Sequence, residues 1–287
     1  MKIIKPIVGI SKIIDNYDIV VCGFNGVLYD GECVKQDAVD ALMKCAASGK
    51  KVVIATNSSL RIAEIIDILS AGKSGVLDYL SAVVSAGEVL HYCLKNPQHF
   101  GFAGNKYYNL GNSAAESVFD GLNYIKSARP DDADFAFIGM VNKASDTSDD
   151  YARALEHCFA LGLPLVAAGN DVSTYCDGQI SLGSGALAEQ YAVMGGVIYT
   201  VGKPAPDFVK YALEGIAKPE SKVLFIGDAF ATDIKSANMI NADAVLISKG
   251  IHVNYLGEGY IPDVEKARNL AMNFDVYPDY VISGLRW

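Results

Sequence analysis

The chain of 287 residues lacks three features that mark other classes of protein. It has no run of 18 uncharged apolar residues, so we expect no membrane-spanning helix. No CxxC pair occurs among its six cysteines, so no zinc-binding framework is visible. Basic runs are also missing, and 33 acidic residues against 24 basic ones give a net charge of −9. We therefore expect neither nucleic acid nor an anionic membrane as a partner.

What the sequence does have is enough apolar material for a large core. Apolar residues make up 51% of the chain, which excludes a disordered protein. A chain of this length predicts about two domains. The cysteines are spread along the chain, which is typical of reduced thiols in a cytoplasmic protein. Lys2, Lys5 and Pro6 interrupt the first apolar stretch, so we expect no signal peptide.

Short apolar runs alternate with helical patterns in the first hundred residues and again after residue 198. Asp18–Cys22 and Val52–Ala55 are β-branched runs, which predict strands buried on both faces. Between and after them, Val34–Ser48 and Arg61–Leu69 have apolar residues at helical spacing. This order predicts an α/β protein with a parallel sheet. Further expected strands are Ala82–Ser85, Val223–Ile226 and Ala244–Ile247, and further expected helices are Glu88–Leu94, Phe208–Ile216 and Asp233–Met239.

The middle of the chain has a different pattern of residues. Glycine-rich loops begin near residue 96, and a separate strand–helix–strand unit follows. We therefore predict a core domain of residues 1–96 and 196–287, with a second α/β domain of residues 97–195 inserted into it. Within the insert we expect strands at Tyr107–Leu110, Phe135–Met140 and Leu165–Ala168, and helices at Tyr151–Ala160 and Gly183–Gly196.

Chemically informative residues follow the predicted core strands. Ligands of open parallel sheets bind where the strands end, so these segments are taken together. Thr56 and the backbone N–H groups that follow it, Asn57 included, can cradle phosphate oxygens, and Lys203 can neutralise them. Asp228 and Asp233 can hold Mg²⁺, which prefers carboxylate oxygens. Each motif alone has an ordinary explanation as a turn, a helix cap or a loop lysine, but their joint placement indicates a phosphate-and-metal site.

These stretches resemble the haloacid dehalogenase (HAD) superfamily, class IIA, in its NagD-like and p-nitrophenylphosphatase-like branch. The matching segments are GVLYDGE (26–32), SGKKVVIATNSS (48–59), VGKPAPDFVKYAL (201–213) and VLFIGDAFATDIKSANMINADAVLISKG (223–250). The resemblance implies a Rossmann-like core with a parallel sheet and an inserted α/β cap. It also implies Mg²⁺-dependent hydrolysis of phosphomonoesters through a phospho-aspartate, with Thr56 and Lys203 on the phosphate and Asp228 and Asp233 at the metal.

The first motif departs from the family pattern at both catalytic positions. Gly23 stands where the pattern has the nucleophilic aspartate, and Asn25 stands where it has the acid/base aspartate. Glycine can form no phospho-enzyme, and asparagine does not exchange a proton near neutral pH. The backbone carbonyl of Asn25 remains as a metal ligand, but two carboxylates are gone. We expect Mg²⁺ to bind weakly or not at all.

Three functions stay open at this point. The first is a phosphatase scaffold that is weakly active or inactive and binds inorganic phosphate or a small phosphorylated molecule. The second is an active Mg²⁺-dependent phosphatase with a non-standard nucleophile. Asp30 is one candidate, although it resembles an ordinary turn aspartate, while Cys22 is expected in the core. The third is a non-catalytic subunit that binds a protein partner; a homodimer formed through the cap is a further expectation.

Two other features carry less weight. Gly183–Ala188 fits GxGxxA, but no acidic residue follows at the spacing that a dinucleotide site requires, so we interpret it as a glycine-rich turn before a helix. The four histidines share no motif. By the resemblance, the specificity loop of the cap corresponds to Gly169–Asp177.

Overall fold

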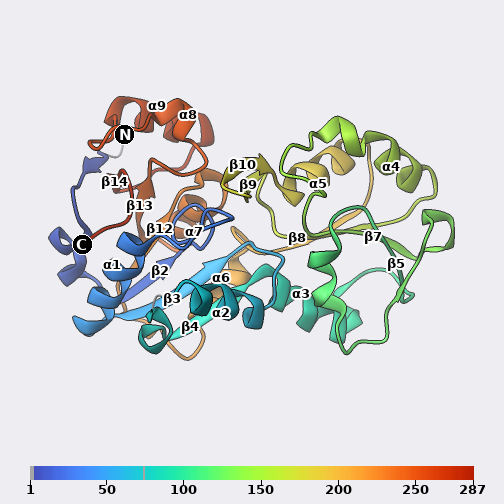
Figure 1. Ribbon diagram of the computed structural model, residues 1–287, viewed down its shortest axis with the longest axis horizontal. Coiled ribbons are helices and arrows are strands. Elements are labelled where there is room, and N and C mark those ends of the chain that lie inside the picture. The colour runs from blue at the N-terminus through green and yellow to red at the C-terminus, as the bar shows by residue number, and fades with distance from the viewer. Residues whose placement is uncertain (1–2, 74) are drawn as a thin grey trace.

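Two lobes lie side by side in the computed structural model, which describes residues 3–73 and 75–287 (Figure 1). The larger one, the core lobe, contains a seven-stranded sheet in which every strand runs parallel to its neighbours. In spatial order its strands are β1 (Lys5–Pro6), β14 (Tyr280–Ile282), β13 (Asp243–Ile247), β12 (Val223–Gly227), β2 (Ile19–Cys22), β3 (Lys51–Thr56) and β4 (Ala82–Ser85).

Helices cover both faces of this sheet, which explains the uninterrupted apolar runs in its strands. In β2, Val20 and Cys22 point to the face covered by α1 and α2, while Ile19 and Val21 point to the opposite face. All four side chains are buried, so Cys22 is a core residue as expected. The helices are α1 (Gln36–Ala47) and α2 (Ile62–Ala71) on the first face, and α6 (Pro206–Leu213), α7 (Lys235–Met239), α8 (Val253–Leu256) and α9 (Val264–Phe274) on the second.

The smaller, cap lobe contains a second parallel sheet of five strands. One face of it packs against α4 and α5, and the other carries a layer of aromatic side chains beneath α3. In spatial order its strands are β11 (Ile198–Val201), β8 (Leu165–Ala168), β7 (Phe135–Ile138), β5 (Lys106–Asn109) and β6 (Ile125–Lys126), and its helices are α3 (Ala86–Lys95), α4 (Ser148–Ala160) and α5 (Ser184–Val193).

The sheets place the edges of the cap lobe outside the predicted range of 97–195. Strand β11, which the prediction assigned to the core, pairs with β8 in the cap sheet. Helix α3 was also assigned to the core, but its Leu90 and Leu94 belong to the aromatic cluster of the cap. The cap lobe therefore extends from about α3 to β11, because these end segments bury their apolar side chains against the cap sheet.

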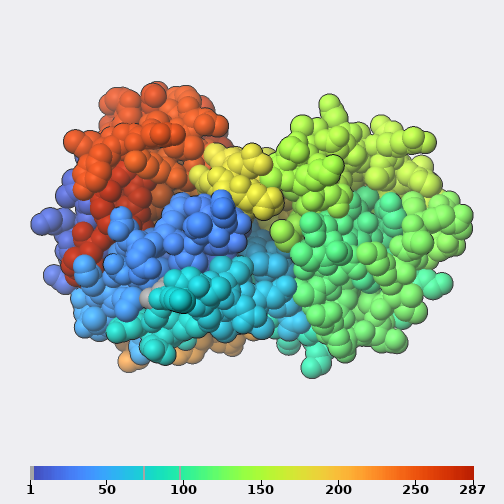
Figure 2. Space-filling view, in the orientation of Figure 1, coloured from blue at the N-terminus to red at the C-terminus, as the bar shows by residue number. Residues whose placement is uncertain are grey.

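An antiparallel hairpin projects from the cap toward the core. It consists of β9 (Ser173–Cys176) and β10 (Gln179–Leu182). Figure 2 shows this hairpin, in yellow, filling the space between the two lobes. Within residues 3–73 and 75–287, no helix is long and apolar enough to cross a membrane.

Candidate functional site

Six predicted site residues meet at the carboxyl edge of the core sheet. Strands β2, β3 and β12 are neighbours, so the segments that follow them lie together. Lys203 reaches the same place from β11, at the return from the cap. A cavity of about 20 Å³ lies among these segments. Its lining includes Asn25, Thr56, Asn57, Lys203, Asp228 and Asp233.

A buried ion pair forms part of the wall of this cavity. The Nζ atom of Lys203 donates to Oδ1 of Asp233 at 2.5 Å and to the carbonyl of Ala55 at 2.7 Å. Both charged residues are 4% exposed. Burial lowers the pKa of Lys203, but the nearby carboxylates of Asp233 and Asp171 outweigh burial and leave its pKa above the ordinary value. The lysine is therefore a fixed positive charge in the site.

A short π-helix orients Asp233 toward the lysine. The π-helix spans Phe230–Ile234, and such turns are frequent at functional sites. Its geometry lets Oδ2 of Asp233 accept the backbone N–H groups of Asp228 at 3.1 Å and Ala229 at 3.2 Å. A Cβ on Gly227 would lie 2.1 Å from Cγ of Asp233, so only glycine fits beneath the carboxylate.

Two glycines of the first motif have different reasons to be glycine. Gly26 has a φ of +76°, and a Cβ there would lie 1.9 Å from Oδ2 of Asp228. Gly23 has no such constraint: a Cβ would lie 3.4 Å from Val27 Cγ2 and 3.5 Å from Asp233 Oδ1, which are ordinary contact distances. The backbone at Gly23 therefore has room for a Cβ, so close packing does not require glycine here.

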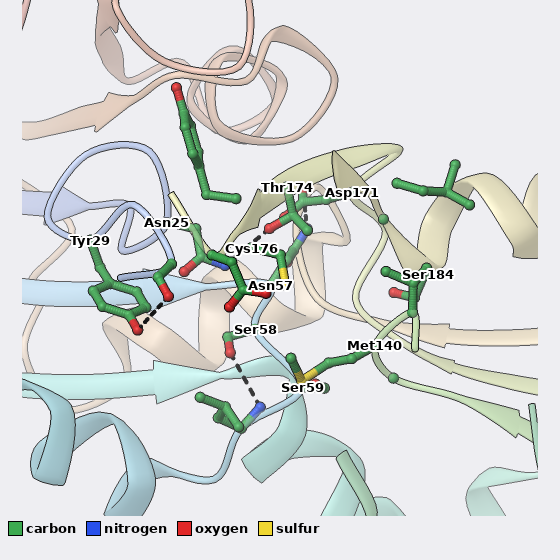
Figure 3. Close-up of a pocket in the computed structure, with 18 of the residues that line it drawn as sticks. Asn25, Tyr29, Asn57, Ser58, Ser59, Met140, Asp171, Thr174, Cys176 and Ser184 are labelled. Atoms are coloured by element: carbon green, nitrogen blue, oxygen red, sulfur yellow. Dashed lines mark hydrogen bonds between the residues drawn. The ribbon is translucent and has the colours of Figure 1, made fainter. Parts of the chain in front are cut away.

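Asn25 connects the core to the cap hairpin. Its Nδ2 donates to Oγ1 of Thr174 in β9 at 3.1 Å. Figure 3 shows Asn25, Asn57, Asp171 and Thr174 gathered where the hairpin meets the core strands. Through this hydrogen bond the amide helps to hold the hairpin over the cavity.

The side chain of Asn57 binds two loops. Its Oδ1 accepts the backbone N–H of Lys203 at 2.6 Å, and its Nδ2 donates to the carbonyl of Lys203 and to Oδ1 of Asp171, both at 3.0 Å. Both amide hydrogens are thus occupied, so only the backbone N–H of Asn57 is available for the predicted phosphate contact. Thr56 Oγ1 accepts the N–H of Ser58 at 3.1 Å and lines the cavity.

The sequence did not indicate Asp171 as a site residue. The cap loop that contains it folds over Asn57, and Gly169 allows this approach because a Cβ there would lie 2.3 Å from the Asn57 carbonyl oxygen. Burial raises the pKa of Asp171, while Lys203 and hydrogen bonds from Asn57 and Thr232 oppose the rise. Only the placement of Gly169–Asp177 in the specificity loop pointed toward it.

Family models match the two parts of the core separately. A model described as haloacid dehalogenase-like hydrolase matches residues 20–125, and one described as HAD-hydrolase-like matches residues 200–285. Together they contain every predicted site residue. The chain belongs to the HAD superfamily. Among solved structures, p-nitrophenyl phosphatase from Archaeoglobus fulgidus has the same fold, with a TM-score of 0.64 at 19% identity, over 93% of this chain and 96% of that one.

Full-length relatives support this placement. Chronophin of Rattus norvegicus is 25% identical over 270 residues, covering 91% of this chain and 83% of its own length. The 4-nitrophenylphosphatase of Schizosaccharomyces pombe is 23% identical and covers 96% of this chain and 94% of its own. A HAD-like hydrolase from Brucella suis has the same fold, with a TM-score of 0.79 at 23% identity, over 96% of this chain and 98% of that one. The chain therefore has the scaffold of a HAD phosphatase.

HAD phosphatases use Mg²⁺, but the residues of this chain do not fit the ion as they are arranged. Both oxygens of Asp233 are occupied, by Lys203 and by two backbone N–H groups. Oδ2 of Asp228 accepts the N–H of Ile251 at 2.9 Å, and burial together with Asp233 raises the pKa of Asp228 to about 7. Nowhere in the described part of the chain do three acidic, histidine or cysteine side chains converge as a metal site.

The cavity is also too small for a phosphate group. About 20 Å³ accommodates roughly one water molecule. Beside it lies a larger pocket of about 170 Å³, and the two share Asn25, Asn57, Asp171 and Thr174 as walls. The rest of the larger pocket is lined by residues of the cap, among them Met140, Tyr175 and Ser184, and by residues of the core, among them Tyr29, Leu60 and Ile68. A phosphorylated ligand therefore requires the hairpin to move away from the core.

The alternative nucleophile has an ordinary structural role. Oδ1 of Asp30 accepts the N–H groups of Glu32 and Cys33, as in a common Asx turn. The glycines of GxGxxA also have packing reasons: a Cβ on Gly183 would lie 1.9 Å from the Asp171 carbonyl, and one on Gly185 would lie 2.4 Å from that of Asn170. Helix α5 begins at Ser184, so only Gly183 precedes the helix as expected, and Gly185 already lies in its first turn.

Proposed function

We propose that this HAD protein binds inorganic phosphate or a small phosphomonoester and hydrolyses it weakly or not at all. The observation that carries the proposal is Gly23. A Cβ fits at this position, yet no side chain is present to attack phosphorus. Asn25 supports the same conclusion, because its amide is used to hold Thr174 and has no proton to exchange near neutral pH.

The donor groups of the cavity support binding of an anion, against the carboxylates of Asp171, Asp228 and Asp233 that also line it. Lys203 contributes a fixed positive charge, and Thr56 with the N–H of Asn57 contributes neutral donors. Relative to the family pattern, two carboxylates are missing from the cavity wall, which removes repulsion of phosphate. Mg²⁺ is expected to be weakly bound or absent, because Asp228 and Asp233 already have protein partners.

Location and self-association belong to the proposal as well. We propose a cytoplasmic protein, supported by six cysteines that are all unpaired.

We also propose a homodimer formed through the cap, where Phe159, Val193, Val197 and Ile198 expose apolar side chains near the free edge of β11. Sedimentation velocity is expected to show a dimer that Val193→Asp with Val197→Asp converts to a monomer; a monomeric wild type would contradict it.

Restoration of the missing carboxylates tests the catalytic part of the proposal. Wild type and Gly23→Asp/Asn25→Asp are assayed with p-nitrophenyl phosphate and a panel of phosphomonoesters, with and without Mg²⁺. We expect no turnover by wild type and Mg²⁺-dependent turnover by the double variant. A general acid/base alone contributes about 10² to 10⁴ in rate, so the gain should be large. The matched control is Gly23→Asn/Asn25→Asp, which has nearly the same shape but no nucleophilic carboxylate.

Calorimetry with inorganic phosphate tests the binding part separately. Wild type is expected to bind phosphate, and Lys203→Met is expected to lose this binding. Turnover by wild type that disappears in Lys203→Met would overturn the inactive assignment. Absence of heat with phosphate, in wild type that is correctly folded, would overturn the assignment as a phosphate-binding protein.

A further inference from the structure

A second groove lies on the core lobe, outside the cavity of Lys203. Its volume is about 560 Å³, within the usual range for small-molecule sites. Helix α1 forms one side and the C-terminal segment forms the other (Figure 1). Buried Val27, Ile247 and Leu285 form its apolar floor. It shares no lining residue with the catalytic cavity or the pocket beside it.

Three basic residues line this groove: Lys35, Lys249 and Arg286. Among the residues that the structure describes, no carboxylate lies within 4.0 Å of any of their cationic nitrogens. The only acidic residue in the lining is Asp37. Asp228 and Asp30 oppose the effect of burial on the pKa of Lys35, but neither contacts its ammonium. Three cations that lack a contacting carboxylate are unexpected around one groove in a chain whose net charge is −9.

Two of the cations are held in place by neutral groups. Nζ of Lys35 donates to the carbonyl of Gly26 at 2.9 Å and lies 5.4 Å from the ring centre of Tyr175. The guanidinium of Arg286 stacks on Tyr260 at 3.9 Å and donates to the Val8 carbonyl and to Oγ of Ser283. These contacts orient the side chains before any ligand arrives, which reduces the entropy lost on binding.

Lys249 differs from the other two because it is exposed, and within residues 3–73 and 75–287 its ammonium makes no hydrogen bond or ion pair. It stands on the loop after β13, beside Gly250. A ligand with negative charge would bring the three cations a common counter-ion, and the apolar floor would cover its carbon atoms.

We propose that this groove is a second anion-binding site, which takes a small metabolite with two or more negative charges on phosphate or carboxylate groups. The site does not depend on the proposed function, since its residues take no part in the cavity of Lys203. Arg286 contributes the planar donor group, which suits such oxyanions, and the two lysines contribute point charges.

Pyrophosphate is a suitable probe, and two readouts locate where it binds. In amide NMR spectra of the wild-type chain, pyrophosphate should shift the signals of Gln36, Gly284 and Arg286. Calorimetry should show binding that Lys249→Glu weakens at least fivefold. Lys210→Glu, an exposed position on α6, makes the same charge change outside the groove and should leave the affinity within twofold.

Contrary outcomes are equally clear. If pyrophosphate shifts only amides of the catalytic cavity, such as Asn57 and Gly202, the groove is not the site. Equal weakening by Lys249→Glu and Lys210→Glu would show only a general effect of charge. Absence of any binding to folded wild type would also overturn the proposal. Phosphate binding at Lys203 is decided separately, by the titration of wild type and Lys203→Met with inorganic phosphate.

Discussion

His252 makes the stability of the core lobe sensitive to acid. Its ring lies 5.3 Å from that of Phe230 and 5.7 Å from that of Phe274, and its buried Nε2 has no hydrogen-bond partner among the residues that the structure describes. Burial lowers the pKa of His252 from 6.5 to about 4. The folded state therefore favours neutral histidine. The contribution of neutral His252 to the unfolding free energy is complete above pH 6.5, and it is lost as the pH falls from 6.5 through 4.

His252→Phe should remove this dependence, because phenylalanine preserves the aromatic packing and carries no charge. Linkage between the two pKa values predicts that, between pH 7.5 and 5.5, wild type loses about 1.4 kcal/mol of unfolding free energy that the variant keeps. For a chain of this size the melting temperature of the variant should gain about 3 °C relative to wild type over that interval. Lower pH is avoided because the isoelectric point is near 4.9.

Urea unfolding and calorimetry at both pH values measure the difference. His157→Phe, at an exposed position on α4, is the matched control for the exchange of histidine for phenylalanine. If His252→Phe differs from wild type by the same amount at pH 7.5 and 5.5, the neutral buried histidine is refuted. A change in the opposite direction would refute it as well.

Two further predictions test the contacts of the catalytic loop. Gly26→Ala should lose at least about 2 kcal/mol of stability, because its φ of +76° and the Asp228 carboxylate leave no room for a Cβ. Gly23→Ala should stay within about 1 kcal/mol of wild type, and equal losses of the two variants in urea unfolding would contradict this. Thr174→Val removes the acceptor of the Asn25 hydrogen bond, which is worth about 1 kcal/mol. Hydrogen exchange of the hairpin amides should become about fivefold faster, while the core strands keep their exchange rates. Unchanged exchange in the hairpin would show that the Asn25 contact does not hold it.

Local elements were predictable because their signals are local. Strands β4 and β8 have the bounds that were expected, and most other expected elements differ by one to four residues at their ends. The hairpin β9–β10, the edge strand β1 and its neighbour β14 were not expected. Strand β1 has only two residues, and Ser173–Cys176 in β9 has no apolar alternation, so neither contains a period that can be recognised.

The domain edges show where local reasoning fails. A helix pattern indicates that Leu90 and Leu94 are buried, but it does not indicate against which sheet. The tertiary structure places them on the cap sheet, and it places β11 beside β8. Sheet membership depends on contacts between segments that are distant in the sequence. The change in residue pattern near residue 97 therefore did not indicate which segments join the cap sheet.

The sequence by itself determined which chemical groups are available: a parallel α/β scaffold, Lys203 and two aspartates at strand ends, and no carboxylate at positions 23 and 25. These are properties of single residues and of short periodic runs. Only the tertiary structure decided what those groups contact. It pairs Lys203 with Asp233, adds Asp171 and Thr174 from the cap, and gathers Lys35, Lys249 and Arg286 around one groove. Such contacts join residues that lie far apart in the sequence, and only the folded chain brings them within a few ångströms.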